Sequence, residues 1–240
     1  MSELLFRDDA YLTECAARVV AADERGVRLD RTVFYARGGG QPGDSGVLET
    51  DSGVRVEIVD AVKGEAADEV IHVPADGAPP LAPGTAVSAS IDWPRRHRLM
   101  RMHSCLHLLS ALVPGAVTGG QVGADRSRLD FDLPEGGLDK DALSAALNRL
   151  IAEDHPLVAR WVSEAELDAN PDLVKTMSVK PPRSAGSVRL IEVAGVDVQA
   201  CGGTHVRRSG EIGPVRVIKI ESKGRRNRRV TVALAAKEDG

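Results

Sequence analysis

Two pairs of metal-ligand residue types occur in this sequence, each with a spacing of four. His103 and His107 lie within "RMHSCLHLL", and Cys201 and His205 lie within "ACGGTHVRR". Histidines at positions i and i+4 of a helix project from one face, so both imidazoles can reach one ion. The two glycines of the second pair allow a tight turn that brings its side chains together. Three imidazoles and one thiolate are a ligand set suited to Zn²⁺, and the sequence predicts one such ion held by all four residues.

The remaining histidines and cysteines have no such spacing. His72, His97 and His155 are expected to have surface or packing roles, and Cys15 and Cys105 are expected to be small buried apolar residues. An odd number of cysteines does not fit a disulfide framework and agrees with a reducing compartment.

A glycine-rich segment, "ARGGGQPGDSG" at residues 36–46, is the third candidate feature. Gly38, Gly39 and Gly40 cost folding entropy, so the backbone there must form a tight turn, approach a ligand closely, or both. Gln41 adds one amide. The segment matches neither a dinucleotide nor a nucleoside-triphosphate loop. The chain also shows no nucleophile elbow and no HExxH sequence, so neither a serine hydrolase nor a zincin protease is indicated.

The composition is that of an ordinary globular protein, with 42% hydrophobic and 28% charged residues. Aromatic residues make up only 3%, so the core must be mainly aliphatic. The formal net charge is −4, yet residues 95–101 and 219–229 are densely basic. Each basic run can be a solvated face or an anion-binding surface. The sequence shows neither a membrane span nor a signal peptide at its N-terminus, and a cytoplasmic location is expected.

Residues 1–91 have the pattern of a β-rich domain. Short alternating segments separated by Gly, Asp and Pro predict strands, which are typical of a small barrel or sandwich. The predicted strands are Ala17–Ala21, Gly26–Leu29, Thr32–Tyr35, 54–63, 69–74 and 86–92.

Residues 92–240 have a mixed pattern and form the second predicted domain. Apolar residues at Leu99, Met102, Leu106, Leu109 and Val113 predict a helix over 95–113 that ends at the following Pro-Gly. The other predicted elements are a strand at 127–134, a helix at 138–157, a strand leading into a short helix at 157–170, two strands at 187–206 that turn at Gly195, and a hairpin at 211–235 with a basic tip. The fold class is therefore α+β: a barrel-like domain, then helices on an antiparallel sheet.

Four segments of this sequence together resemble a known family. "GGGQPGDSG", "DWPRRHRLMRMHSCLHLL", "CGGTHV" and "ESKGRRNRRV", in this order, resemble the editing domain of alanyl-tRNA synthetase. They are still more similar to the free-standing AlaX trans-editing proteins, of the medium-length type. The resemblance covers nearly the whole chain. It implies hydrolysis of the ester between a wrong amino acid, serine or glycine, and the 3′ end of tRNA for alanine. It also implies the two-layer fold of the related threonyl-tRNA synthetase editing domain. No adenylation domain is present, so no use of ATP is expected.

The resemblance also implies roles for individual residues. The zinc ion would help to seat the terminal adenosine and to orient water, and Gln41 with Gly38–Gly40 would line the pocket. Thr204 would hydrogen-bond the acyl group, and the residues expected to take part in catalysis are Gln41, Ser104, Cys201 and Thr204. The residues expected to hold tRNA phosphates are Arg95, Arg96, Arg98, Lys223, Arg225, Arg226, Arg228 and Arg229.

The sequence departs from the family between the two helix histidines. Ser104, Cys105 and Leu106 stand where the synthetase pattern is close to Thr-Ala-Thr, which could enlarge the acyl pocket by one methyl group. Threonine, or an analogue of it, is therefore an alternative acyl group. A tRNA-binding zinc module without catalysis is a further alternative. Four protein ligands resemble a closed structural site, so an unrelated metallohydrolase is disfavoured. The sequence leaves open whether zinc acts in catalysis or organises the site, which group is the general base, and the oligomeric state.

Overall fold

The computed structural model describes residues 2–66, 68–133, 137–169, 183–184 and 187–235. The chain divides into two compact units, Met1–His97 and Arg98–Gly240, and each is described by itself. The boundary falls within helix α1 (Trp93–Leu112). That the chain forms two domains divided near residue 92 stays a prediction.

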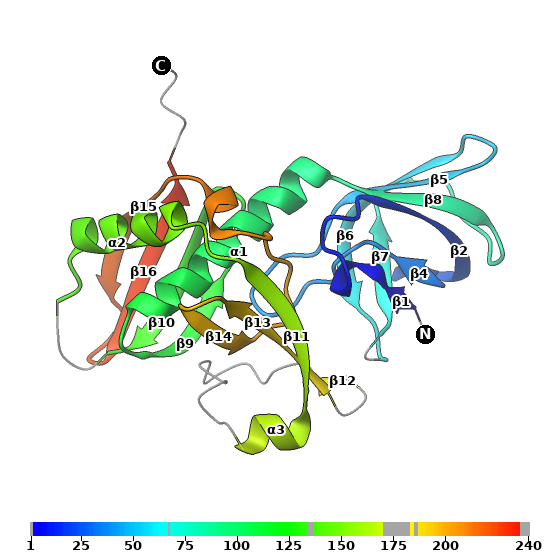
Figure 1. Ribbon diagram of the computed structural model, residues 1–240. Coiled ribbons are helices and arrows are strands. Elements are labelled where there is room, and N and C mark those ends of the chain that lie inside the picture. The colour runs from blue at the N-terminus through cyan, green and yellow to red at the C-terminus, as the bar shows by residue number, and fades with distance from the viewer. Residues whose placement is uncertain (1, 67, 134–136, 170–182, 185–186, 236–240) are drawn as a thin grey trace. The chain divides into compact units, whose positions relative to one another are not determined.

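The first unit is built around a closed barrel of six strands, which confirms the predicted small barrel (Figure 1). In barrel order the strands are β2 (Glu14–Asp23), β3 (Gly26–Leu29), β7 (Val70–Pro74), β6 (Arg55–Lys63), β5 (Gly46–Thr50) and β8 (Ala86–Ile91). Buried and exposed residues alternate along β6 and β8, as they must when one face of a strand fills a barrel interior. The core is largely aliphatic, with Leu29, Leu48, Ile58 and Ala89 fully buried around Phe34. Outside the barrel, β1 (Glu3–Leu4) pairs with β4 (Arg31–Thr32), and a short 3₁₀ turn, η1 (Leu5–Arg7), follows β1.

The strand predicted at Thr32–Tyr35 is wrong beyond Thr32. Side chains replace the strand ladder here: the Phe34 N–H donates to Thr32 Oγ1 (3.0 Å), and the Tyr35 N–H donates to Asp44 (2.6 Å). Such local side-chain acceptors compete with sheet pairing. The sequence also missed β5, because a five-residue strand with one fully buried side chain, Leu48, gives almost no alternation.

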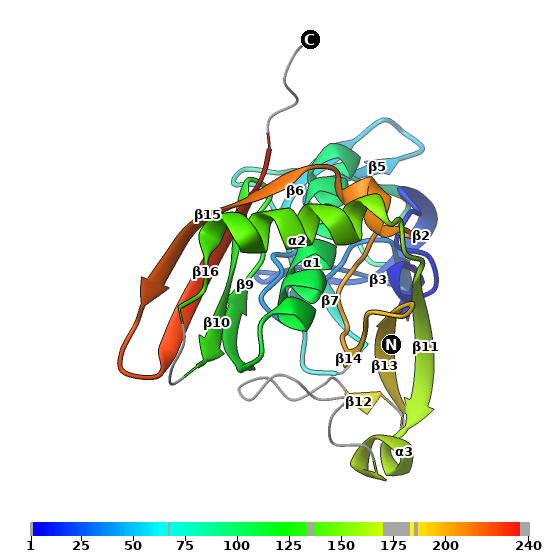
Figure 2. The same ribbon diagram turned by 60° about the vertical axis from the view of Figure 1, so that its left-hand side comes forward.

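The second unit contains α1 from Arg98 onward and two antiparallel sheets. One sheet has the order β15-β16-β10-β9, and the other has β13 between β11 and both β12 and β14. The strands are β9 (Ala116–Gln121), β10 (Arg126–Asp132), β11 (Leu157–Ser163), β12 (Arg183–Ser184), β13 (Ser187–Val193), β14 (Asp197–Ala200), β15 (Val215–Ser222) and β16 (Asn227–Leu234). Helix α2 (Lys140–Ala152) packs on β15, short helix α3 (Glu164–Ala169) follows β11, and a 3₁₀ turn, η3 (Ser209–Ile212), precedes β15 (Figure 1, Figure 2). This arrangement confirms the predicted α+β class.

Helix α1 is buried around most of its circumference. The predicted apolar stripe is buried, and Met100, Cys105 and Leu108 on other sides of the helix are also fully buried. A helix that is covered on more than one face carries its polar side chains inside as well. Several polar residues of α1 are therefore buried among protein groups, namely Arg96, His103, Ser104, His107 and Ser110.

Helix α2 begins as predicted and ends earlier than predicted. The Asp139 side chain caps it by accepting the Ala142 N–H (2.7 Å), while Leu143, Leu147 and Ile151 form the buried stripe. It ends at Ala152 because Asp154 adopts a positive φ of 54°. The strand leading into a short helix that was predicted over 157–170 is confirmed as β11 and α3, and residue 170 of that prediction lies outside the described residues.

Strand β9 was not predicted. Two of its six residues are glycines, which weaken the strand pattern in the sequence. Its backbone hydrogen bonds to β10 stabilise the strand instead. The hairpin of β15 and β16 and the strand pair turning at Gly195 are confirmed. Within the described residues, none of the helices combines the length and the apolar character needed to span a bilayer.

Candidate metal centre

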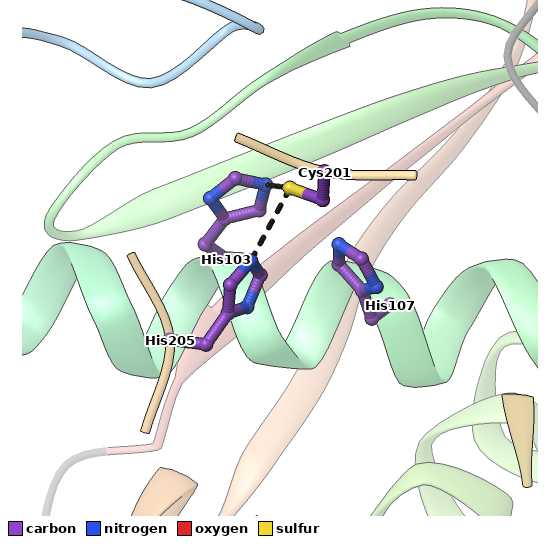
Figure 3. A group of neighbouring side chains, drawn as sticks. All are labelled: His103, His107, Cys201 and His205. Carbon is purple, nitrogen blue, oxygen red and sulfur yellow. Dashed lines mark hydrogen bonds between the residues drawn. The ribbon is translucent and has the colours of Figure 1, made fainter. Parts of the chain in front are cut away.

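Four side chains of the second unit converge on one point above α1 (Figure 3). His103 and His107 project from successive turns of the helix, while Cys201 and His205 come from the loop that follows β14. Their ligand atoms all lie within 4.8 Å of one another. The Cys201 sulfur is 3.3 Å from His205 Nε2 and 3.6 Å from His103 Nε2. The structure thus brings together the four residues that the sequence singled out, in an arrangement that could bind a metal ion.

The four side chains differ in exposure. The three histidines are each 6% exposed, whereas Cys201 is partly exposed. The cluster therefore lies largely beneath the protein surface, and Cys201 is its least buried residue.

The turn that carries Cys201 is held by Arg189, a residue that the sequence analysis missed. Arg189 Nη1 donates to the carbonyl oxygens of Cys201 (3.1 Å) and Gly203 (2.9 Å), and the Cys201 N–H donates to the Arg189 carbonyl (3.0 Å). The Gly203 N–H in turn points at the Cys201 sulfur (3.4 Å). A charged residue within the apolar strand "SVRLIEV" was the signal that could have identified Arg189, because a buried arginine requires acceptors.

Ser104 and Thr204 are both fully buried. The Ser104 hydroxyl accepts the N–H of Val206 (3.2 Å) and lies 3.2 Å from His205 Nδ1. His205 Nε2 faces the cluster, so a neutral ring that offers its Nε2 lone pair there carries its proton on Nδ1 and donates it to Ser104. The position of Ser104 behind His205 favours an orienting role over the contact with the acyl group that the sequence suggested.

Burial dominates the electrostatics of the cluster. It holds the pKa values of His103 and His205 well below the usual range, and the neighbouring His107 and Arg189 lower them further. Burial also raises the pKa of the Cys201 thiol, against the smaller opposing effects of the Gly203 N–H and Arg189. The imidazoles of His103 and His205 therefore favour the neutral form, whose lone pairs can bind a metal, and the Cys201 thiol favours its protonated form in the absence of a cation.

The glycine-rich segment forms a two-residue hairpin turn in the first unit. Gly38 and Gln41 exchange backbone hydrogen bonds of 2.9 and 3.1 Å, and the residues between them, Gly39 and Gly40, have φ values of 56° and 82°. Positive φ at both central positions is the type I′ geometry that favours glycine. The Tyr35 hydroxyl donates to the Gly38 carbonyl (2.7 Å), and Gln41 is 1% exposed. The expected tight turn is thus present.

Arg96 corrects one prediction outright. It was expected to hold tRNA phosphates, but it is 0% exposed. Its guanidinium makes bonds of 2.9 Å to both carboxylate oxygens of Asp44 and donates to the carbonyls of Ala10 and Val33. Arg96 is a core residue that holds the loop after the glycine turn. A dense run of arginines in the sequence did not reveal that one of them points inward.

The other predicted phosphate-binding residues are at the surface, and most have internal partners. Arg95 donates to the Gly43 carbonyl (2.8 Å), while four others pair with acids: Arg98 with Asp125, Lys223 with Glu221, Arg226 with Asp132 and Arg229 with Asp130. Arg225 and Arg228, at the tip between β15 and β16, pair with no carboxylate in the described part of the chain. They are the arginines there whose charge is most available to an anion.

Outside the cluster, the histidines have surface or packing roles and Cys105 is buried, as expected, whereas Cys15 is less buried than expected. His72 is fully buried, between Thr32 Oγ1 (2.8 Å) and the Val27 carbonyl (2.9 Å). His97 stacks on Trp93, and His155 lies 2.8 Å from a Glu153 carboxylate oxygen. Cys105 is fully buried, and Cys15 is half-buried.

Two family descriptions match parts of this chain. "tRNA synthetases class II (A)" matches residues 7–95, and "Threonyl and Alanyl tRNA synthetase second additional domain" matches residues 188–231.

Individual relatives match much more of the chain. The alanyl-tRNA editing protein AlaX-M of Methanosarcina acetivorans is 37% identical over 243 residues, which cover 98% of this chain and 99% of that protein. AlaX-M of Saccharolobus solfataricus is 32% identical over 96% of this chain and 98% of its own length. The alanine–tRNA ligase of Methanothermobacter thermautotrophicus is 35% identical over 92% of this chain but only 25% of the ligase.

Proposed function

This chain belongs to the family of AlaX-M alanyl-tRNA editing proteins, and from that premise we propose that it is a trans-acting aminoacyl-tRNA deacylase. Its reaction is hydrolysis of the ester that joins a wrong amino acid, serine or glycine, to the 3′ end of tRNA for alanine, in the cytoplasm. One observation carries the proposal: the chain aligns over its whole length with free-standing editing proteins and with only a quarter of a ligase. The quarter of the ligase that aligns with this chain is therefore the part that corresponds to a free-standing editing protein.

The donor set and its spacing support one zinc ion at the cluster. A tetrahedral zinc with bonds of about 2.0–2.1 Å to nitrogen and 2.3 Å to sulfur requires ligand atoms about 3.3–3.6 Å apart. The Cys201 sulfur meets that requirement with His205 Nε2 and His103 Nε2, at 3.3 and 3.6 Å, while the full set of four ligand atoms spans up to 4.8 Å. When bound, zinc supplies a positive charge that attracts and orients the polar 3′ end of the substrate.

The residues of the chain divide into those that hold the cluster and those that meet the substrate. Arg189 holds the Cys201 turn, and Ser104 keeps the His205 ring in the tautomer that presents Nε2. The proposal places the ester beside Cys201, because Cys201 is less buried than the three histidines. Gln41, Gly38–Gly40 and Thr204 remain predicted lining residues, and Arg225 and Arg228 are the strongest candidates for phosphate contacts.

Deacylation of a panel of charged tRNAs tests the proposal. The panel carries Ser, Gly and Ala on tRNA for alanine and Thr on tRNA for threonine. Rapid loss of Ser or Gly that disappears in a Cys201→Ala/His205→Ala double variant is the expected result. A Cys15→Ser variant changes a cysteine outside the cluster and should keep full activity. Four stable esters, with zinc bound and the tRNA retained, would instead identify a tRNA-binding module without catalysis.

A further inference from the structure

Trp161, Arg189 and Cys201 stand in one row across three neighbouring chain segments. Trp161 of β11 is the register partner of Arg189 of β13. The pairing of β13 with β14 continues by one residue beyond Ala200, because the Cys201 N–H donates to the Arg189 carbonyl (3.0 Å). Figure 1 shows β11, β13 and β14 as adjacent ribbons. Residues opposite one another in antiparallel strands project from the same face, so these three side chains share one face of the sheet.

That face is the one directed at α1. Gln199, two residues before Cys201 and therefore on the same face, donates to the Ser110 hydroxyl of α1 (2.8 Å). The opposite face carries a separate apolar cluster of Val162, Val188 and Leu190. Trp161 thus projects on the side of the sheet where His103 and His107 complete the metal centre.

Trp161 lies at the open end of this row. Its 44% exposure contrasts with the 6% of Arg189 next to it, whose guanidinium is turned to the Cys201 and Gly203 carbonyls. Neighbouring strands are about 4.8 Å apart, so the Trp161 backbone is about 10 Å from that of Cys201. The indole is long enough to extend over part of that separation. A partly exposed aromatic side chain therefore lies about 10 Å across the sheet from Cys201.

We propose that Trp161 is a stacking platform for a base of the unpaired 3′ end of the tRNA. This inference rests on the proposed function, since it places the nucleotide next to the ester that the metal centre receives. Unpaired bases bind proteins by stacking on aromatic side chains, and a tRNA ends in unpaired nucleotides. A base stacked on Trp161 holds the 3′ end of the RNA against this face of the sheet. The ester is thereby positioned on the Cys201 side of the cluster. Trp161 in this role is a positioning residue that acts on binding more than on the chemical step.

Fluorescence provides a test that does not depend on hydrolysis. The chain has two tryptophans, so a Trp93→Phe variant leaves Trp161 as the sole indole. The zinc-loaded variant is titrated with a hairpin RNA that ends in unpaired CCA, and with the same hairpin cut to a blunt end. Quenching by the CCA hairpin at concentrations where the blunt hairpin has no effect is the expected result. Equal responses to both RNAs, or no response to either, overturn the inference.

Kinetics on full-length mischarged tRNA provides the second readout. Trp161→Ala should raise KM about tenfold or more with a smaller change in kcat, as the loss of one base–aromatic stack predicts, and Trp161→Phe should restore most of the difference. Val158→Ala is the matched control, because Val158 is 54% exposed on the opposite face of the same strand and should leave KM unchanged. An unchanged KM in Trp161→Ala would refute the inference while leaving deacylation intact. CCA-specific quenching in a protein that hydrolyses no ester would uphold the inference and refute the proposed function.

Discussion

Nδ1 of His205 lies 3.2 Å from the hydroxyl oxygen of Ser104, the residue directly after His103 on α1. The same hydroxyl accepts the N–H of Val206, so one serine of the helix fixes both the ring and the backbone of the loop that supplies the other ligands. The helix and the loop are therefore coupled beneath the metal centre.

Ser104→Ala should lower zinc affinity about ten- to a hundredfold, the usual effect of losing the partner that orients a ligand histidine. Competition with a chromophoric chelator measures the change. Deacylation should fall at limiting zinc and recover when zinc is in excess. Ser88→Ala, which alters an exposed serine of β8, should bind zinc as the unmodified protein does. Undiminished affinity in Ser104→Ala would show that the hydroxyl does not orient His205.

Arg96→Met should destabilise the protein by about 3–5 kcal/mol, because it leaves the Asp44 carboxylate buried without its cation. Urea denaturation of the zinc-loaded protein measures the loss. Arg55→Ala removes an exposed pair with Glu49 in the same unit and should cost less than about 1 kcal/mol. Similar losses in the two variants would contradict the buried placement of Arg96.

His72 should make stability depend on pH. Burial lowers its pKa from 6.5 to about 4, so between these values the unfolded chain binds a proton that the folded chain does not. The contribution of neutral, buried His72 to the free energy of unfolding is fully present above pH 6.5. It is lost as the pH falls toward 4, and the loss at pH 5 is about 2 kcal/mol. Urea denaturation at pH 5 and at pH 7 measures the free energy of unfolding at each pH. The difference between the two values should be smaller in His72→Gln than in the unmodified protein. Titration of the metal-centre histidines affects both proteins and cancels. Equal differences would exclude His72 as the cause.

The arginines at the tip between β15 and β16 should differ in their contribution to RNA binding. Arg225→Ala and Arg228→Ala should each reduce the slope of log affinity against log salt by about one. Arg226→Ala should change the slope less, because Arg226 already makes two hydrogen bonds to Asp132 (3.0 and 3.1 Å). Filter binding across a potassium chloride series provides the slopes. The reverse order among the three variants would show that the pairing with Asp132 breaks in the complex.

Local patterns in the sequence were sufficient to predict the barrel, helix α1 and the convergence of His103 and His107 with Cys201. The reason is that period-two and period-3.6 apolar patterns report directly which side is buried. The two histidines needed only the helix, and the glycine pair in "CGGTH" indicated a turn.

Features that depend on partners distant in the sequence were not predictable in the same way. Arg96 was predicted to be a surface residue because its partner, Asp44, lies 52 positions earlier in the sequence. No local pattern indicates a contact over that separation. Arg189 was missed because its acceptors, the carbonyls of the Cys201 turn, carry no sequence signal. Strand β9 is specified mainly by its neighbour β10. The sequence indicated only that Trp161 is an aromatic residue within a strand. Its proposed role depends on the strand register that aligns it with Arg189 and Cys201.

The order in which the barrel closes has a consequence for how the chain emerges during synthesis. β8, the last barrel strand in the sequence, pairs on one side with β2 and on the other with β5. Until residues 86–91 have been made, β2 and β5 each keep an open edge, and such edges recruit other strands. A nascent or truncated chain that stops before residue 86 should therefore aggregate readily, whereas six more residues remove both edges at once.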